Sequence, residues 1–208
     1  RATKPMSGST RHGEKAIATA TDSLDDVKLL EMVAQGDREA FSQLYLKYQP
    51  KLVSYCARLL RDDFAQAADI VDDALFDVWR SAGKFAGKSK PSTWIYSITR
   101  NKLVSWLRKT TEITLDDERM MLSMVDTAAT PEETREQEDM KHQLLRLMNH
   151  LTDEHRDVLR LTYFEDKSVK EVADILGISD NTVKTRMFYA RKRLGQMLEK
   201  AGIMEFRF

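Results

Sequence analysis

Apolar residues recur at helical spacing along most of this 208-residue chain. Phe41, Leu44, Tyr45 and Tyr48, for example, fall at i, i+3, i+4 and i+7, which places them on one face of an α-helix. The chain contains only 8 Gly and 4 Pro, so few positions interrupt these runs. The pattern therefore predicts an all-α protein.

Capping residues and helix breakers divide the pattern into separate helices. Ser23 and Asp37 are expected to cap two helices, Gly36 to end the first, and Pro50 to make the second restart or kink. Further helices are predicted over residues 64–81 and 92–109. Together these elements form one predicted domain, residues 23–109, and a second helical domain is expected over residues 137–200.

Polar segments without a sustained apolar stripe lie outside these two domains. We expect residues 1–22 to be a disordered N-terminal extension and residues 201–208 a short tail. Residues 110–136 are predicted to be a flexible acidic linker containing one short helical turn at most. A coil of about thirty residues typically spans ~30 Å, so it would reach between two binding sites without fixing their separation.

Charge is balanced overall, with 33 basic and 33 acidic residues, which taken alone argues against a nucleic-acid-binding protein. The charges are nevertheless segregated along the chain, because residues 78–111 and 181–197 contain no acid, whereas residues 112–139 contain ten acids and two bases. The bases of the two acid-free blocks are Arg80, Lys84, Lys88, Lys90, Arg100, Lys102, Arg108 and Lys109, and Lys184, Arg186, Arg191, Lys192 and Arg193. The sequence thus predicts two positive surfaces joined by a negative tether.

Several function classes lack their signatures in this sequence. The sequence contains no run of 18 uncharged apolar residues, so a membrane span is not predicted. The single cysteine, Cys56, favours a reducing compartment such as the cytoplasm. We find no nucleophile–base pair, phosphate-binding glycine loop or zinc-ligand spacing. An enzyme, a cofactor and a metal site are therefore not expected.

The sharpest pattern lies between Ser168 and Leu198. Ser168 and Glu171 form a predicted capping box, Gly177 supplies a tight turn, and Ser179 caps a basic second helix. This arrangement is typical of a helix-turn-helix whose second helix enters the major groove, although a helical hairpin with a solvated basic face is the plainer alternative. The outward face of the second helix carries Asn181, Thr182, Lys184, Thr185, Phe188 and Arg191.

An acidic stripe is predicted on the helix over residues 64–81. Asp69, Asp72, Asp73 and Asp77 fall at i, i+3, i+4 and i+8, so they share one side of the helix. The stripe is interpreted as a docking strip for a basic partner, as a solvated face, or as part of a metal site in a nuclease. The metal site is the weakest interpretation, because hard cations require oxygens from several segments.

Aromatic residues of the first domain allow two roles. Trp79, Trp94 and Trp106 are expected to be core anchors rather than base stackers, and Trp94 would support the basic loop that precedes it. The role of Tyr96 is left open.

Two segments carry a resemblance to a known family. Residues 69–80 (DIVDDALFDVWR), Phe85 and residues 92–101 (STWIYSITRN) resemble region 2 of the extracytoplasmic-function (ECF) sigma factors. Residues 151–159 (LTDEHRDVL) and the helix-turn-helix with residues 182–186 (TVKTR) are similar to region 4 of that family. The resemblance covers residues 24–109 and 140–198.

The resemblance implies a subunit that binds core RNA polymerase, recognises the −35 and −10 promoter elements, melts the promoter and directs transcription initiation, of stress-response genes in this family. It also implies an anti-sigma factor as partner, which would hold the protein at the inner membrane where it is membrane-tethered. The rival hypotheses are a stand-alone helix-turn-helix regulator and, more remotely, the metal-dependent nuclease.

The same resemblance assigns roles to single residues. It implies that Asp69, Asp72, Asp73 and Phe76 dock on the clamp helices of the large polymerase subunit, whose flap is a further contact. The loop from Phe85 to Thr93 would receive a flipped −10 base, and the −10 contacts would be Phe85, Lys88, Ser89, Lys90, Asn101 and Lys102. The −35 contacts would be Asn181, Thr182, Lys184, Thr185, Arg186, Phe188 and Arg191.

Four positions depart from the family pattern. Asp72 stands where Gln is frequent, and Pro91 stands where an aromatic residue is common. Tyr189 and Thr162 occupy positions that are often basic in the family. We therefore expect a more acidic docking face and altered promoter contacts.

Overall fold

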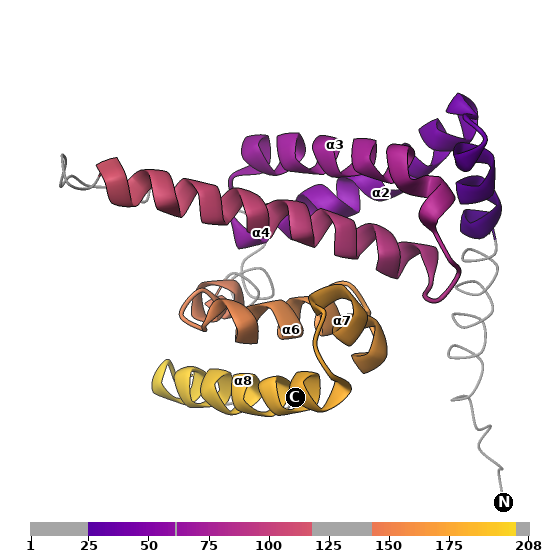
Figure 1. Ribbon diagram of the computed structural model, residues 1–208. Coiled ribbons are helices and arrows are strands. Elements are labelled where there is room, and N and C mark those ends of the chain that lie inside the picture. The colour runs from indigo at the N-terminus through magenta and orange to yellow at the C-terminus, as the bar shows by residue number, and fades with distance from the viewer. Residues whose placement is uncertain (1–24, 61, 118–142, 203–208) are drawn as a thin grey trace, which may run out of the picture. The chain divides into compact units, whose positions relative to one another are not determined.

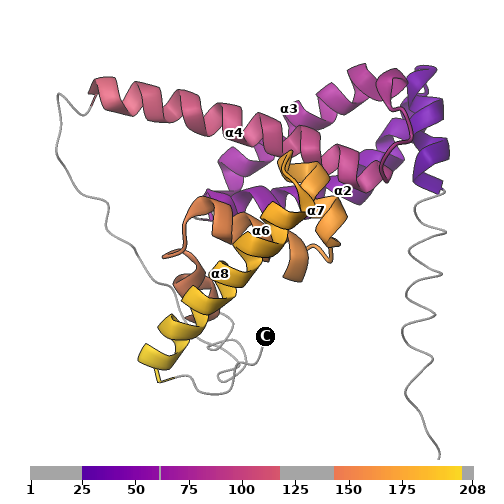
Figure 2. The same cartoon turned by 60° about the horizontal axis from the view of Figure 1, so that its bottom comes forward.

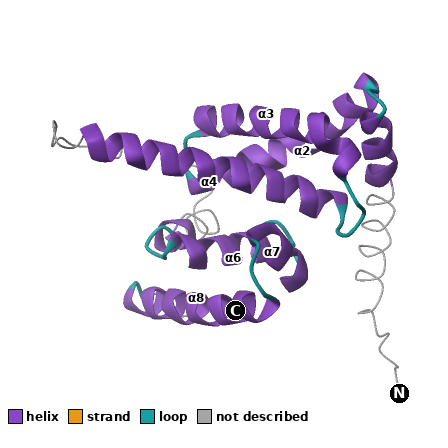
Figure 3. Cartoon of the chain, in the orientation of Figure 1, coloured by secondary structure: helices purple, strands orange, loops and turns teal. Residues whose placement is uncertain are grey.

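The computed structural model describes residues 25–60, 62–117 and 143–202. These residues contain helices and no β-strand (Figure 3), so the prediction of an all-α protein is confirmed. The predicted N-terminal extension, most of the linker and most of the tail lie outside the described residues. None of the described helices is long and apolar enough to cross a membrane.

The chain divides into two compact units, residues 1–104 and residues 105–208. The first unit contains a helix over residues 25–34, α2 (Arg38–Leu59), α3 (Phe64–Ser81), the short 3-10 helix η1 (Ala82–Lys84) and the N-terminal half of α4 (Pro91–Asp117). The second unit contains a helix over residues 143–148, α6 (Asp153–Tyr163), α7 (Val169–Leu176) and α8 (Asp180–Lys200).

The core of the first unit lies where α2, α3 and α4 pack together (Figures 1 and 2). Each helix buries one face, and Tyr55 of α2 packs its ring 5.6 Å from that of Tyr96 of α4. Trp79 of α3 makes an edge contact with Phe41 of α2 at 5.1 Å. These contacts place Tyr96 in the core and give Trp79 its expected packing role. The buried core side chains include Leu44, Tyr48, Leu52, Ile70, Val71, Leu75, Val78, Ile95 and Leu103.

A buried polar cluster attaches the first helix to α2. The Asp26 side chain is only 2% exposed, and its carboxylate accepts hydrogen bonds from Lys47 at 2.7 Å and from the Tyr48 hydroxyl at 2.5 Å. A buried carboxylate is costly unless it is paired, so these two partners are what make the position of Asp26 tolerable. The cluster therefore fixes how the first helix meets α2.

Two helix boundaries differ from the sequence prediction. Pro50 lies inside α2, which continues from Arg38 to Leu59 without a restart. Pro50 is exposed, so water reaches the backbone group that loses its hydrogen bond, while buried Leu44, Tyr48 and Leu52 on either side hold the helix together. Similarly, α4 runs to Asp117 rather than ending at Lys109, because no Gly or Pro interrupts it.

The second unit shows the predicted helix-turn-helix. The Ser168 hydroxyl accepts the Glu171 amide while the Glu171 carboxylate accepts the Ser168 amide, which confirms the capping box. Gly177 has φ 65°, a left-handed conformation that glycine adopts without strain. Ser179 caps α8 by accepting the Thr182 amide at 3.1 Å. Val183, Met187, Ala190 and Leu194 face the core as predicted.

Candidate nucleic-acid and polymerase interfaces

The outward face of α8 carries the residues expected at the −35 element. Asn181, Lys184, Thr185 and Phe188 are exposed. They fall at i, i+3, i+4 and i+7, so they form one stripe over the first turns of the helix. An α-helix fits the major groove and presents such a stripe to base edges. These four side chains are therefore in a position to read sequence.

The other three predicted −35 residues are engaged within the second unit. Thr182 shares a hydrogen bond with Ser179 at 2.8 Å, and the Arg191 Nε donates to the Met187 carbonyl at 3.3 Å. Arg186 lies 3.5 Å from the Glu154 carboxylate of α6. The Thr182 and Arg191 contacts are local to α8 and its cap, whereas the Arg186–Glu154 contact joins α8 to α6.

Tyr189 is a surface residue that the site prediction did not include. Its ring packs edge-on against that of Phe188 at 5.4 Å, and the two side chains are 53% and 58% exposed. Large aromatic rings at this exposure are unusual on a helix that is otherwise polar, and they offer apolar contact to thymine methyl groups. The spacing in the sequence could have identified this residue, because Tyr189 follows the predicted contact Thr185 by four residues and so lies on the same side of the helix.

The predicted −10 loop is shorter than expected. Helix α4 begins at Pro91, so the irregular segment runs from residue 85 to residue 90, and Thr93 is only 1% exposed within the helix. Proline favours the first position of a helix, which explains why α4 begins there. Phe85 lies against Trp94 with ring centroids 5.3 Å apart, so Trp94 supports the loop as predicted. Lys88 is exposed at its tip.

Lys102 and Asn101, both expected at the −10 element, differ in their surroundings. Asn101 is exposed on α4. Lys102 forms an ion pair with Asp77 of α3, with Nζ and the carboxylate oxygen 2.6 Å apart. The acidic stripe of α3 is therefore linked directly to the basic face of α4.

The acidic stripe of α3 divides into three environments. Asp69 and Asp73 are exposed, whereas Asp77 is paired with Lys102. Asp72 accepts a hydrogen bond from the Tyr45 hydroxyl of α2 at 2.8 Å, and this bond, together with burial and the Asp72 charge, raises the pKa of Tyr45 above its ordinary value. Next to the stripe, Phe76 is 55% exposed with the Arg80 guanidinium 5.2 Å above its ring. An exposed aromatic ring is the kind of side chain that protein interfaces favour, and here it lies beside the exposed carboxylates Asp69 and Asp73.

The sequence also allows the acidic stripe of α3 to be part of a metal site. Among the described residues, no three His, Cys, Asp or Glu side chains are grouped so that they could hold a metal ion. The carboxylates of α3 lie along one helix, and the neighbouring Tyr45 hydroxyl of α2 donates a hydrogen bond to Asp72, whereas a hard cation requires oxygen ligands from several segments.

Two family descriptions match the two units. Residues 44–113 match Sigma-70 region 2, and residues 141–194 match Sigma-70, region 4. The first match includes α3, the loop after η1 and most of the basic part of α4, and the second match includes the helix-turn-helix. The fold and these surfaces define a DNA-binding sigma factor of RNA polymerase.

Individual relatives narrow the class further. The chain is 28% identical to the RNA polymerase sigma-H factor of Pseudomonas aeruginosa over 84% of this chain and 94% of that protein. It is 28% identical to the ECF RNA polymerase sigma factor SigW of Bacillus subtilis (82% and 95%) and 26% identical to the ECF RNA polymerase sigma-E factor of Escherichia coli (86% and 97%). The chain belongs to the extracytoplasmic-function sigma factors, a non-enzymatic family of RNA polymerase sigma subunits.

Two solved structures share the fold with a TM-score of 0.61 each. One is CnrH in complex with the cytosolic domain of CnrY, 22% identical, with 85% of this chain and 98% of that chain covered. The other is the sigma factor RpoE in complex with the anti-sigma factor NepR from Bartonella quintana, 25% identical, with coverage of 76% and 96%.

Proposed function

We propose that this sigma factor divides its work among three surfaces. The exposed acids and Phe76 of α3 bind the polymerase core, the loop over residues 85–90 and the basic face of α4 hold the opened −10 element, and the outward face of α8 reads the −35 element. The observation that carries this proposal is the separation of exposed chemistry by element: carboxylates on α3, cations and an amide on the loop and α4, and polar and aromatic groups on α8.

The −10 surface is suited to opening DNA without catalysing a reaction. Unstacking a base costs a few kcal/mol, and a protein offsets this cost by holding the extruded base and the phosphates of the separated strand. Exposed Lys88 and Asn101 provide a cation and a hydrogen-bonding amide, and Phe85 provides an aromatic ring supported by Trp94. The same polypeptide therefore supplies the electrostatic and stacking contacts that a melted strand requires.

Regulation by an anti-sigma factor is part of the proposal. RpoE of Bartonella quintana was solved with the anti-sigma factor NepR bound. Exposed Phe76 on α3 and the Phe188–Tyr189 pair on α8 are apolar surfaces that such a partner would cover. The protein would then act in the cytoplasm, where the polymerase and the promoters are.

Transcription in vitro tests the proposal directly. Core polymerase, the full-length chain and a promoter library are expected to give specific transcripts that are absent without the chain. Asp73→Arg is expected to abolish capture of core because it reverses an exposed charge at the centre of the docking surface, while the charge-matched Glu199→Arg in the last turn of α8 retains capture. Specific promoter binding that needs no core would instead support a stand-alone regulator.

A further inference from the structure

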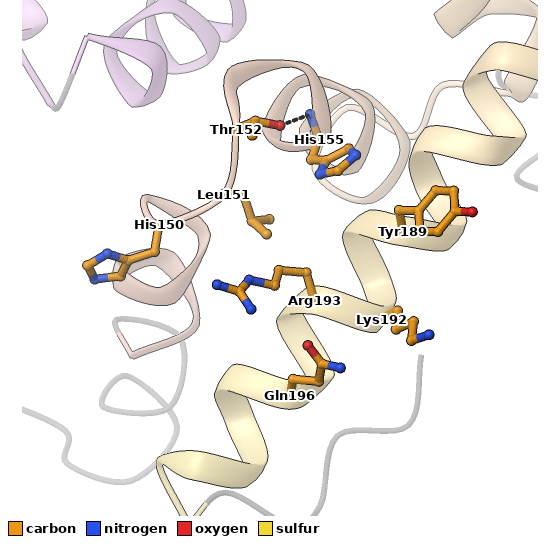
Figure 4. A pocket seen from close by; sticks show the side chains of 8 residues that line it. All are labelled: His150, Leu151, Thr152, His155, Tyr189, Lys192, Arg193 and Gln196. Carbon is orange, nitrogen blue, oxygen red and sulfur yellow. Dashed lines mark hydrogen bonds between the residues drawn. The ribbon is translucent and has the colours of Figure 1, made fainter.

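A second basic surface lies on α8, beyond the residues assigned to the −35 bases. An open groove of about 490 Å³ separates the third to fifth turns of α8 from the segment over residues 150–155. Figure 4 shows Arg193 reaching from α8 toward Leu151, while Lys192 leaves the helix on the side of Tyr189. The residues that line the groove are His150, Leu151, Thr152, His155, Tyr189, Lys192, Arg193 and Gln196.

The charge of this groove is not neutralised by the acids near it. Asp153 pairs with Arg156 at 3.1 Å, and Glu154 lies 3.5 Å from Arg186. Within the part of the chain that the structure describes, neither Lys192 nor Arg193 has an ion-pair partner, and no carboxylate lines the groove. An anionic group at this face of α8 would therefore find two unpaired cations, with the side chains of His155 and Gln196 as hydrogen-bonding neighbours.

The groove is continuous with the predicted recognition face. Thr185, Tyr189, Lys192 and Gln196 fall at i, i+4, i+7 and i+11, so they extend one side of α8 away from the base-reading turns. Phosphates flank a helix that lies in the major groove, and side chains beside the base-reading stripe are placed to contact them. Beyond Tyr189 this side of α8 carries the cation of Lys192 and the amide of Gln196.

We infer that Lys192 and Arg193 bind backbone phosphates of the duplex beside the −35 element, with His155 and Gln196 as hydrogen-bonding neighbours. This inference rests on the proposed function, because it requires α8 to lie at promoter DNA. It adds contacts that strengthen and orient binding without reading sequence, so its effect is distinct from that of Lys184. The salt dependence of DNA binding measures the number of these phosphate contacts. Each neutralised duplex phosphate contributes about 0.9 to the magnitude of the slope of the logarithm of the binding constant against the logarithm of the salt concentration.

The experiment uses full-length protein in complex with core polymerase and a duplex promoter fragment. The double variant Lys192→Ala/Arg193→Ala is expected to reduce the magnitude of the salt slope by about 1.8 and to weaken binding at 0.15 M salt by roughly 30-fold, about 5-fold for each lost contact. Its preference among −35 sequences should not change. Lys200→Ala is the matched control, because it removes an exposed cation from the same helix outside the groove.

Neutral methylphosphonate linkages locate the contact. Placed one at a time beside the −35 element, they should weaken binding of the wild-type chain at one or two positions. At those positions they should not change the affinity of the double variant. An unchanged salt slope, or a changed sequence preference, overturns the inference. Loss of core capture with an intact slope would show that the groove receives an acidic protein segment instead.

Failure of this inference can be distinguished from failure of the proposed function. If the wild-type complex never binds a promoter, the proposed function fails. If the wild-type complex binds and the double variant keeps its full salt slope, only the phosphate contacts are wrong. Circular dichroism of the double variant shows whether the fold is retained, which is expected because both replaced side chains are exposed.

Discussion

Single charged residues on the surface of this protein differ in whether a neighbouring side chain has already paired with them. Lys184 and Asp73 are exposed and have no ion-pair partner among the described residues, whereas Lys102 is paired with Asp77 at 2.6 Å. An unpaired side chain reaches a ligand without first breaking an internal contact. Lys184 and Asp73 are therefore the most informative positions at which to test DNA reading and polymerase docking.

Lys184→Ala is expected to relax recognition of the −35 element. A side chain that reads a base edge contributes about 1–3 kcal/mol of discrimination against the wrong base, so the variant should lose roughly that amount between the preferred and a mismatched element. Competition binding of the polymerase complex to the two elements measures it. An unchanged preference with weaker binding to both would assign Lys184 to a phosphate.

Tyr45 provides a pH-dependent test of the acidic stripe. The hydrogen bond to Asp72 raises the pKa of Tyr45 above the ordinary value of 10.0, so the folded state favours the protonated hydroxyl. The stabilisation is fully present below pH 10 and is lost as the pH rises through the folded-state pKa. Urea unfolding of the wild type and Tyr45→Phe should therefore differ by a constant amount, about 0.5 kcal/mol for an exposed hydrogen bond, up to pH 9, and by less above pH 10. A difference that grows with pH contradicts this assignment.

Among the elements, the helix-turn-helix depends on one backbone conformation. Gly177 ends α7 with φ 65°, and the turn to Ser179 sets the direction in which α8 leaves. Because a side chain there would meet open space, the cost of replacing this glycine is one of backbone strain alone. Gly195 lies inside α8, also faces open space and has no positive φ. It is therefore a matched control, because its helical backbone is one that alanine adopts readily.

The two Gly→Ala changes should therefore have opposite effects. Gly177→Ala is expected to lower the free energy of unfolding by about 1–2 kcal/mol, since an L-residue disfavours the left-handed region. Gly195→Ala is expected to raise it by about 0.5–1 kcal/mol, because alanine restricts the unfolded chain and favours the helix. Circular dichroism during urea unfolding measures both. A Gly177→Ala variant as stable as the wild type would mean that the turn tolerates another conformation.

On the scale of the whole molecule, the protein consists of two compact units that carry different exposed surfaces. The first unit carries the acidic stripe and the −10 surface, and the second carries α8. Each surface by itself is small, so neither is expected to hold a promoter tightly. When both units are presented by one scaffold, the second contact becomes intramolecular and the affinities reinforce each other.

The full-length chain without core polymerase is therefore expected to bind a promoter at least 100-fold more weakly than the complex with core, the lower end of the gain that linked sites provide. Binding titrations at a single salt concentration compare the two, with a fragment carrying scrambled −10 and −35 elements as the control. Tight specific binding by the isolated chain would show that core is not the scaffold.

Local features of the fold were well predicted from the sequence. The Ser168 capping box, the left-handed Gly177 and the Asp37 cap each depend on residues within one turn of each other, so the sequence displays them directly. The differences at Pro50, where the helix does not restart, and at Pro91, where α4 begins, have another origin. Whether a proline ends a helix, sits inside it or begins it depends on which side chains around it are buried, and burial is a property of the packed unit.

The order of helices, their caps, the buried stripes and the family could all be derived from residues close together in the chain, because helix formation and capping are governed by spacings of three and four residues. The contacts between polar side chains of different helices could not be derived in this way. Asp77 with Lys102, Asp72 with Tyr45 and Glu154 with Arg186 join side chains from different helices, and the groove beside Arg193 exists only where α8 faces residues 150–155. Such contacts depend on distances of a few ångströms between packed helices, and the folded arrangement alone sets those distances.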